Sequence, residues 1–118
     1  MAGLTTHILD LTYGQPASNV TIDLYRVEED KGMTFIKSAT TNKDGRLDHA
    51  LLEAEELEHA IYQLVFHIGP YFRGRGVEIE DPLFLDQVPV QFGVNDPTTH
   101  YHVPLLVSPW GYQVYRGS

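Results

Sequence analysis

The sequence contains no cysteine. Disulfides, thiolate nucleophiles and cysteine-ligated metal sites are therefore excluded. A small chain without cysteine also suits a reducing compartment. At 118 residues the chain has the length of a single domain spanning residues 1–118, long enough to bury a self-supporting core without cross-links.

Basic residues are scarce: the chain has 8 Lys and Arg but 16 Asp and Glu, which gives a formal net charge of −8. Binding to phosphates needs a basic face, so this balance argues against a nucleic-acid partner. No apolar run approaches the roughly 20 residues that cross a bilayer, so we expect no membrane partner. The first residues do not resemble a secretory signal, and the last three differ from the common peroxisomal tripeptide. We therefore expect a cytoplasmic protein.

The strongest signal present is an alternation of apolar and polar residues with a period of two, which predicts strands. The predicted strands are residues 4–9, 20–27, 34–41, 61–68, 88–94, 100–107 and 111–116. About seven or eight short strands in this length indicate a β-sandwich. Pro89 argues that its strand lies at a sheet edge. Residues 51–60 have helical propensity but marginal length for a helix, and residues 70–76 are compatible with a short helical turn.

Six histidines provide most of the available chemistry; they are His7, His49, His59, His67, His100 and His102. Taken singly, most histidines are surface residues or hydrogen-bonded core residues. His100 and His102 differ, because a spacing of two on a strand places both on one face. Such a pair could ligate a metal if a third ligand were near, and Asp96 offers a carboxylate.

Acid–base chemistry is the alternative use of this pair. Histidine has a pKa of about 6.5, and a nearby arginine favours its neutral, proton-accepting form. A hydrolase that adds water to a carbonyl needs a neutral base and a cation for the developing oxyanion. His102 would be that base and Arg46 that cation, if the fold brings them together. Arg46 follows the tight Asp-Gly turn of residues 44–45. Ser118 lacks a Gly-x-Ser-x-Gly elbow, so a positioning role is preferred to a nucleophilic one.

Three segments carry a family resemblance. Residues 4–10 (LTTHILD), 41–46 (TNKDGR), and 100–109 (HYHVPLLVSP) with 115–118 (YRGS) resemble the 5-hydroxyisourate hydrolases, transthyretin-related enzymes of purine breakdown. The resemblance runs from about residue 4 to the last residue. The YRGS segment separates these enzymes from transthyretin itself, a hormone carrier. One departure is Gln113-Val114, where the family usually has Ser-Thr.

The resemblance implies an all-β, transthyretin (prealbumin)-like sandwich of two four-stranded sheets, with one short helix near residues 70–76. Subunits of the family pair edge to edge, and two dimers meet around a channel that holds the active sites. We therefore expect a homotetramer. The implied reaction is hydrolysis of 5-hydroxyisourate to 2-oxo-4-hydroxy-4-carboxy-5-ureidoimidazoline, without a metal or an organic cofactor.

The resemblance also implies the site residues. It makes His7, Arg46, His102 and Ser118 catalytic, and His7, Arg46 and Tyr115 substrate-binding, with no metal ligand. His102 and His7 would activate water, while the planar guanidinium of Arg46 would hold the substrate's oxygen atoms. A non-catalytic, transthyretin-like binder of planar aromatic molecules is the alternative, but it predicts loss of at least one of these residues. A structural β-sandwich module is a third possibility, in which the retained residues would be a coincidence.

Overall fold

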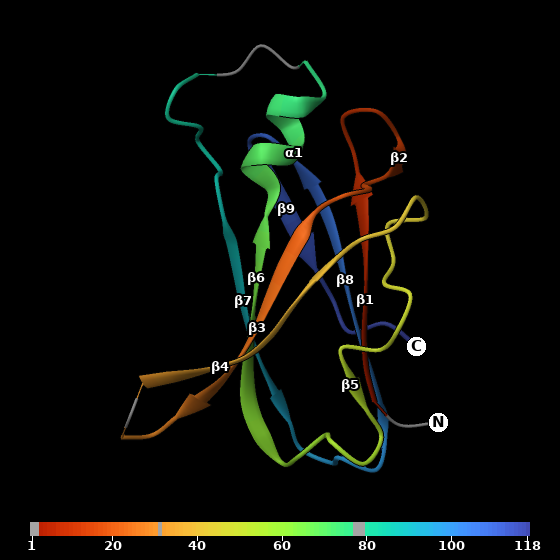
Figure 1. Ribbon diagram of the computed structural model, residues 1–118, viewed down its shortest axis with the longest axis vertical. Helices are drawn as coiled ribbons and strands as arrows, with labels where there is room; N and C mark the ends of the chain where they lie inside the picture. The colour runs from red at the N-terminus through yellow and green to blue at the C-terminus, as the bar shows by residue number, and fades with distance from the viewer. Residues whose placement is uncertain (1–2, 31, 77–79) are drawn as a thin grey trace.

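The computed structural model describes residues 3–30, 32–76 and 80–118 (Figure 1). Its elements, in chain order, are β1 (Gly3–Asp10), β2 (Gln15–Pro16), β3 (Thr21–Glu28), β4 (Gly32–Thr40), β5 (Leu52–Glu53), β6 (Ala60–His67), α1 (Ile68–Gly74), β7 (Val88–Val94), β8 (His100–Ser108) and β9 (Gly111–Val114). Every strand predicted from the alternation is present. The periodicity therefore located the strands, with boundaries that differ by up to two residues.

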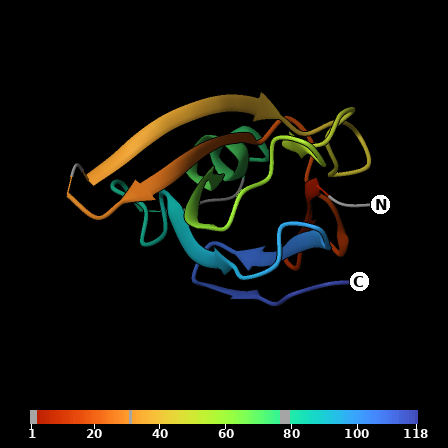
Figure 2. The same cartoon turned by 90° about the horizontal axis from the view of Figure 1, so that it is seen from below.

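The strands form two sheets that face each other (Figures 1 and 2). One has the order β2-β1-β8-β9 and the other has the order β4-β3-β6-β7. This confirms the all-β sandwich with a short helix, but the first sheet has five strands because the two-residue β5 also pairs with β1. β7, which contains Pro89, is the outermost strand of its sheet, as predicted, and an edge position tolerates the missing N–H of proline.

The core lies between the sheets and takes alternate residues of each strand. On β1 these are Leu4 and Ile8, and on β8 they include Leu105 and Val107, all fully buried. Burying each such side chain contributes about 1.5–3 kcal/mol. Thr6 is also buried in this layer, and its hydroxyl donates to the Val103 carbonyl at 2.6 Å. The opposite face of β1 and β8 is therefore left for polar side chains.

A parallel pairing of β1 with β8 positions those polar side chains. Its register sets Thr5 opposite His102 and His7 opposite Pro104. Directly opposed residues of adjacent strands point to the same face. Residues that are nearly a whole chain length apart in sequence therefore lie side by side on the outer face of this sheet.

Two helical expectations changed. Residues 51–60 form no helix; they contain β5 and turns, because the Leu51 N–H donates to the Leu4 carbonyl and so continues the β1 ladder. α1 begins at Ile68, two residues before the expected start. Pro70 fits there because the N–H groups of the first helical turn have no intrahelical partner. No helix in the described part of the chain is long and apolar enough to cross a membrane.

Candidate active site

Two imidazoles and a hydroxyl meet on the outer face of β1 and β8. Thr5 Oγ1 lies 2.8 Å from His102 Nδ1 and 3.1 Å from His100 Nε2. The two rings are stacked, with centroids 6.3 Å apart and an interplanar angle of 15°. The expectation that His100 and His102 share one face is confirmed, and the threonine hydroxyl bridges them.

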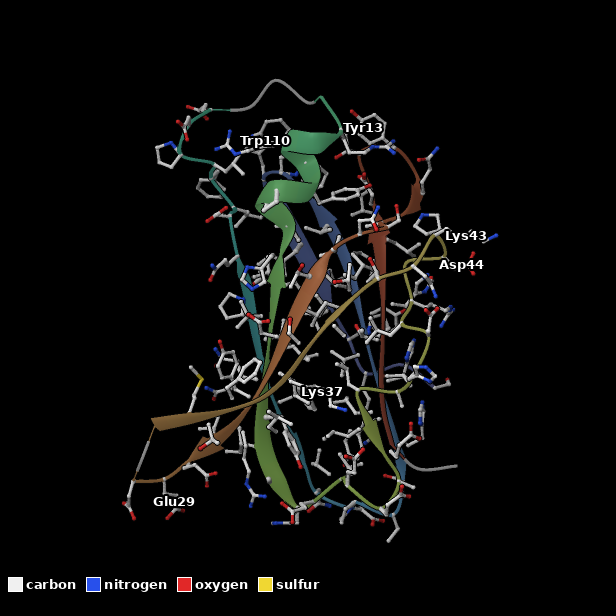
Figure 3. All side chains as sticks on the ribbon, in the orientation of Figure 1. Tyr13, Glu29, Lys37, Lys43, Asp44 and Trp110 are labelled. Atoms are coloured by element: carbon white, nitrogen blue, oxygen red, sulfur yellow. The ribbon has the colours of Figure 1, made fainter. Side chains whose placement is uncertain are left out.

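A tight turn places Arg46. The Asn42 side chain accepts hydrogen bonds from the backbone N–H groups of Asp44 (2.9 Å) and Arg46 (3.2 Å), and the Gly45 N–H donates to the Asn42 carbonyl at 3.0 Å. Gly45 has a φ of +71°, a left-handed conformation that glycine adopts without strain. The Asp44 side chain points outward from this turn (Figure 3). The turn thus reverses the chain just before the guanidinium-bearing residue.

The same turn is fixed against β1. The Ile8 N–H donates to the Gly45 carbonyl at 2.9 Å, and a β-bridge joins His7 to Arg46. A Cβ at residue 45 would collide with the Ile8 carbonyl oxygen. The close approach of turn and strand therefore requires glycine at this position, and it brings Arg46 beside His7.

The C-terminal segment is fixed against β8. The Gly117 N–H donates to the His102 carbonyl at 2.8 Å, and the Arg116 guanidinium lies 4.1 Å from the centroid of the Tyr101 ring. A Cβ at Gly117 would lie 2.6 Å from His102 Cδ2, so glycine is needed for the chain to pack against this imidazole. This packing brings Ser118 to the same face as the histidines.

These segments form an open cavity of about 350 Å³. It is lined by Thr5, Thr6, Arg46, Leu47, Asp48, His49, Ala50, His100, His102 and Ser118. Of the residues predicted for the site, Arg46, His102 and Ser118 line it directly, and His7 adjoins it through its bridge with Arg46. Tyr115 does not: it is half exposed and borders a separate cavity of about 280 Å³ next to β7.

The electrostatics of the site favour neutral imidazoles. Burial lowers the pKa of His102, and the charge of Arg46 lowers it further, with smaller contributions from His100 and His7. Burial and then Arg46 also lower the pKa of His7, although Asp44 opposes the shift. Both groups therefore hold a lone pair at neutral pH and can accept a proton.

Metal binding is the alternative chemistry for the histidine pair of this site. Within residues 3–30, 32–76 and 80–118, no group of three or more His, Asp or Glu side chains is arranged to hold a metal ion. The cavity instead combines imidazoles with the guanidinium of Arg46. A fixed cation in such a place stabilises negative charge that develops on a bound molecule.

Sequence reasoning missed several residues that line the cavity. The sequence predicts no role for Thr5, Asp48 or His49, and it groups His49 with the histidines expected to be surface or hydrogen-bonded core residues. The signal for Thr5 was its spacing of two from His7, which places both on one face of the first strand. His49 follows Arg46 by three residues, which indicates proximity but no function.

Similarity to known proteins agrees with this geometry. The sequence matches the HIUase/Transthyretin family over residues 4–117. The 5-hydroxyisourate hydrolase 2 of Rhizobium meliloti is 52% identical over 115 residues, covering 98% of this chain and 95% of that protein. The structure of Klebsiella pneumoniae 5-hydroxyisourate hydrolase has a TM-score of 0.79 at 32% identity, with 100% of both chains covered. Sparus aurata transthyretin shares the fold, with a TM-score of 0.86 at 24% identity over 99% of this chain and 97% of that one. The chain therefore belongs to the HIUase/transthyretin family.

Proposed function

We propose that this protein hydrolyses 5-hydroxyisourate to 2-oxo-4-hydroxy-4-carboxy-5-ureidoimidazoline, a step of urate and purine breakdown. The observation that carries the proposal is the placement of His102, with its lowered pKa, in one cavity with Arg46. That pair supplies the neutral base and the cation that water attack on a carbonyl requires. Relatives that bear the name 5-hydroxyisourate hydrolase and match nearly the whole chain support the choice of substrate.

In the proposed reaction, His102 accepts a proton from water while the water oxygen bonds to the ring carbonyl carbon. The carbonyl electrons move onto its oxygen, and Arg46 stabilises the resulting negative charge. When the carbonyl re-forms, the ring C–N bond breaks and the leaving nitrogen takes the proton back from the imidazolium. The imidazole is thereby restored, and the reaction consumes one water and opens the ring.

His7 and Ser118 take supporting roles in this proposal. His7 lies beside Arg46 on β1, where it can help to orient water or substrate. Ser118 lines the cavity next to His102, and its hydroxyl can position either the water or the imidazole. Neither role requires a covalent intermediate.

We also propose a homotetramer built as a dimer of dimers, with the reaction taking place in the channel between the dimers. Tyr115 would contact the planar substrate ring there. In the single chain its ring is half exposed and lies outside the cavity that holds His102, so this contact would form only on assembly. The proposed location is the cytoplasm, as expected from the sequence.

The activity can be tested directly. Urate oxidase generates 5-hydroxyisourate from urate, and the ultraviolet absorbance of the product is then followed with and without this protein. We expect decay faster than the spontaneous rate, and His102→Asn should lower kcat by about 10²–10⁴-fold because it removes the base. His59→Asn is the matched control, since His59 is exposed and lies outside this cavity. Wild-type protein that binds the compound without accelerating its decay would show a binder rather than an enzyme.

A further inference from the structure

The hydroxyl of Thr5 lies within hydrogen-bond distance of two imidazoles at once, His102 Nδ1 at 2.8 Å and His100 Nε2 at 3.1 Å. A hydroxyl has a single proton to donate and lone pairs with which to accept. It can therefore donate to only one of these nitrogens, and the other must itself carry a proton to make a hydrogen bond. The arrangement couples the protonation of the two rings.

Two assignments satisfy this requirement. In the first, Thr5 donates to His102 Nδ1, so the proton of the neutral His102 ring sits on Nε2. In the second, His102 Nδ1–H donates to Thr5, Thr5 donates to His100 Nε2, and His102 Nε2 keeps its lone pair. Only the second leaves His102 able to accept a proton from water at Nε2.

His102 lines the cavity, and Nε2 is the ring nitrogen that Thr5 does not engage. The Nδ1 atom is directed to Thr5, and the Cδ2 edge lies against Gly117. In the described part of the chain, no buried side-chain nitrogen or oxygen lacks a hydrogen-bond partner. The side-chain hydrogen bond of His102 uses Nδ1. Since Nε2 has no such partner among the described residues, it cannot be one of the buried atoms, and it is therefore accessible to solvent.

The surrounding charges also favour a neutral His102. Burial lowers the pKa of His102 most, and Arg46 from the turn, His100 from β8 and His7 from β1 lower it further, while a hydrogen bond with the Thr5 backbone opposes the shift. Asp48 and His49 line the same cavity from the loop after the turn. A carboxylate hydrogen-bonded to Nδ1 would orient the ring equally well but would raise its pKa. A hydroxyl followed by an imidazole orients the ring without adding negative charge.

We propose that Thr5 is a positioning residue, which holds His102 in the Nδ1–H tautomer while His100 accepts the proton of the Thr5 hydroxyl. The lone pair of His102 Nε2 is then directed into the cavity for the proton of the attacking water. This inference rests on the proposed hydrolase activity. Thr5 and His100 act through His102 and need not touch the substrate.

The tautomer can be measured without any substrate. Long-range ¹H–¹⁵N NMR correlations distinguish a protonated Nδ1 from a protonated Nε2 in a neutral imidazole, and His102→Asn identifies the resonances. We expect Nδ1–H in wild-type protein and in Thr5→Ser, which keeps the hydroxyl. In Thr5→Val, which keeps the shape but loses the hydroxyl, Nε2–H should become the main form.

The same variants are then assayed for hydrolysis. Thr5→Val should lower kcat/KM by about tenfold to a hundredfold, the loss that is typical when a hydrogen bond that orients a metal-bound histidine is removed. Thr5→Ser should restore most of the rate. Thr34→Val is the matched control, because Thr34 is exposed on β4 in the other sheet.

An Nε2–H tautomer of His102 in wild-type protein would overturn the proposal even if Thr5→Val failed to fold. Equal rates and equal tautomers in wild type and Thr5→Val would also overturn it. Failure of the proposed function looks different, since the wild-type protein would then show the Nδ1–H tautomer without accelerating the decay of 5-hydroxyisourate.

Discussion

His7 and His102 each have a pKa below the ordinary histidine value, because burial and the charge of Arg46 disfavour their protonated forms. A base must be neutral to act, so activity requires a pH above the pKa in the folded protein. The pH profile of kcat/KM reports the pKa of the free enzyme's essential base. We therefore expect its acid limb to lie below about 6.5, the unperturbed value for histidine.

The measurement is kcat/KM between pH 5 and pH 8, roughly one to two units on either side of the ordinary histidine pKa, with spontaneous decay subtracted at each pH. Replacing Arg46 by methionine removes the second cause of the shift, so the acid limb should move up toward the ordinary value. If the rate of this variant is too low, an NMR titration of the His102 ring reports the same pKa. An acid limb at or above the ordinary value in wild-type protein would contradict the expectation.

The turn before Arg46 depends on a single glycine. Gly45 has a positive φ, and a Cβ there would meet the Ile8 carbonyl of β1. Gly14 also has a positive φ, of +66°, but has open space around the position of its Cβ. Gly14→Ala should therefore cost only the conformational term of about 1–2 kcal/mol. Gly45→Ala should cost more than this, because the turn must also move away from β1.

Urea unfolding of the two alanine variants separates the collision from the conformational term. Displacement of the turn also moves Arg46, so Gly45→Ala should reduce activity by up to about 10²-fold. Gly14→Ala should keep the wild-type rate. Equal stability of the two variants would show that the contact between turn and strand is not needed.

Alternation was enough to predict seven of the strands, and it missed the two-residue strands β2 and β5. Leu4 and Ile8 point into the core while Thr5 and His7 point out, as a period of two requires. Alternation does not predict which strands are neighbours in a sheet. The parallel pairing of β1 with β8 joins the two ends of the sequence, and no local pattern records such a contact.

The candidate site was likewise predictable from local patterns only in part. The residues alone left it open whether the fold brings His102 and Arg46 together, and family resemblance was needed to add His7. Thr5 was missed because its importance arises from the register that sets it opposite His102. Tyr115 stays a prediction, since in this chain it borders a different cavity from the one that holds His102.

At the scale of the whole molecule, one edge of the sandwich is suited to assembly. The outermost strands β7 and β9 border a common apolar cavity. Next to them, Trp110, Tyr112 and Tyr115 are each about half exposed, and Figure 3 shows Trp110 at the end of the sandwich that carries α1. Outermost strands offer backbone groups that another chain can pair with, and exposed aromatic side chains gain from burial there.

We therefore expect sedimentation equilibrium to give four times the 13.3 kDa mass of the chain. Tyr112→Arg should shift the protein toward smaller species, because a charge would be buried in the strand-edge contact. Phe84→Arg is the control, since Phe84 is also an exposed aromatic but lies outside the strands. Loss of the tetramer should also lower activity if Tyr115 contacts the substrate only across the channel. A Tyr112→Arg variant that is monomeric yet fully active would place the whole reaction within one chain and remove Tyr115 from it.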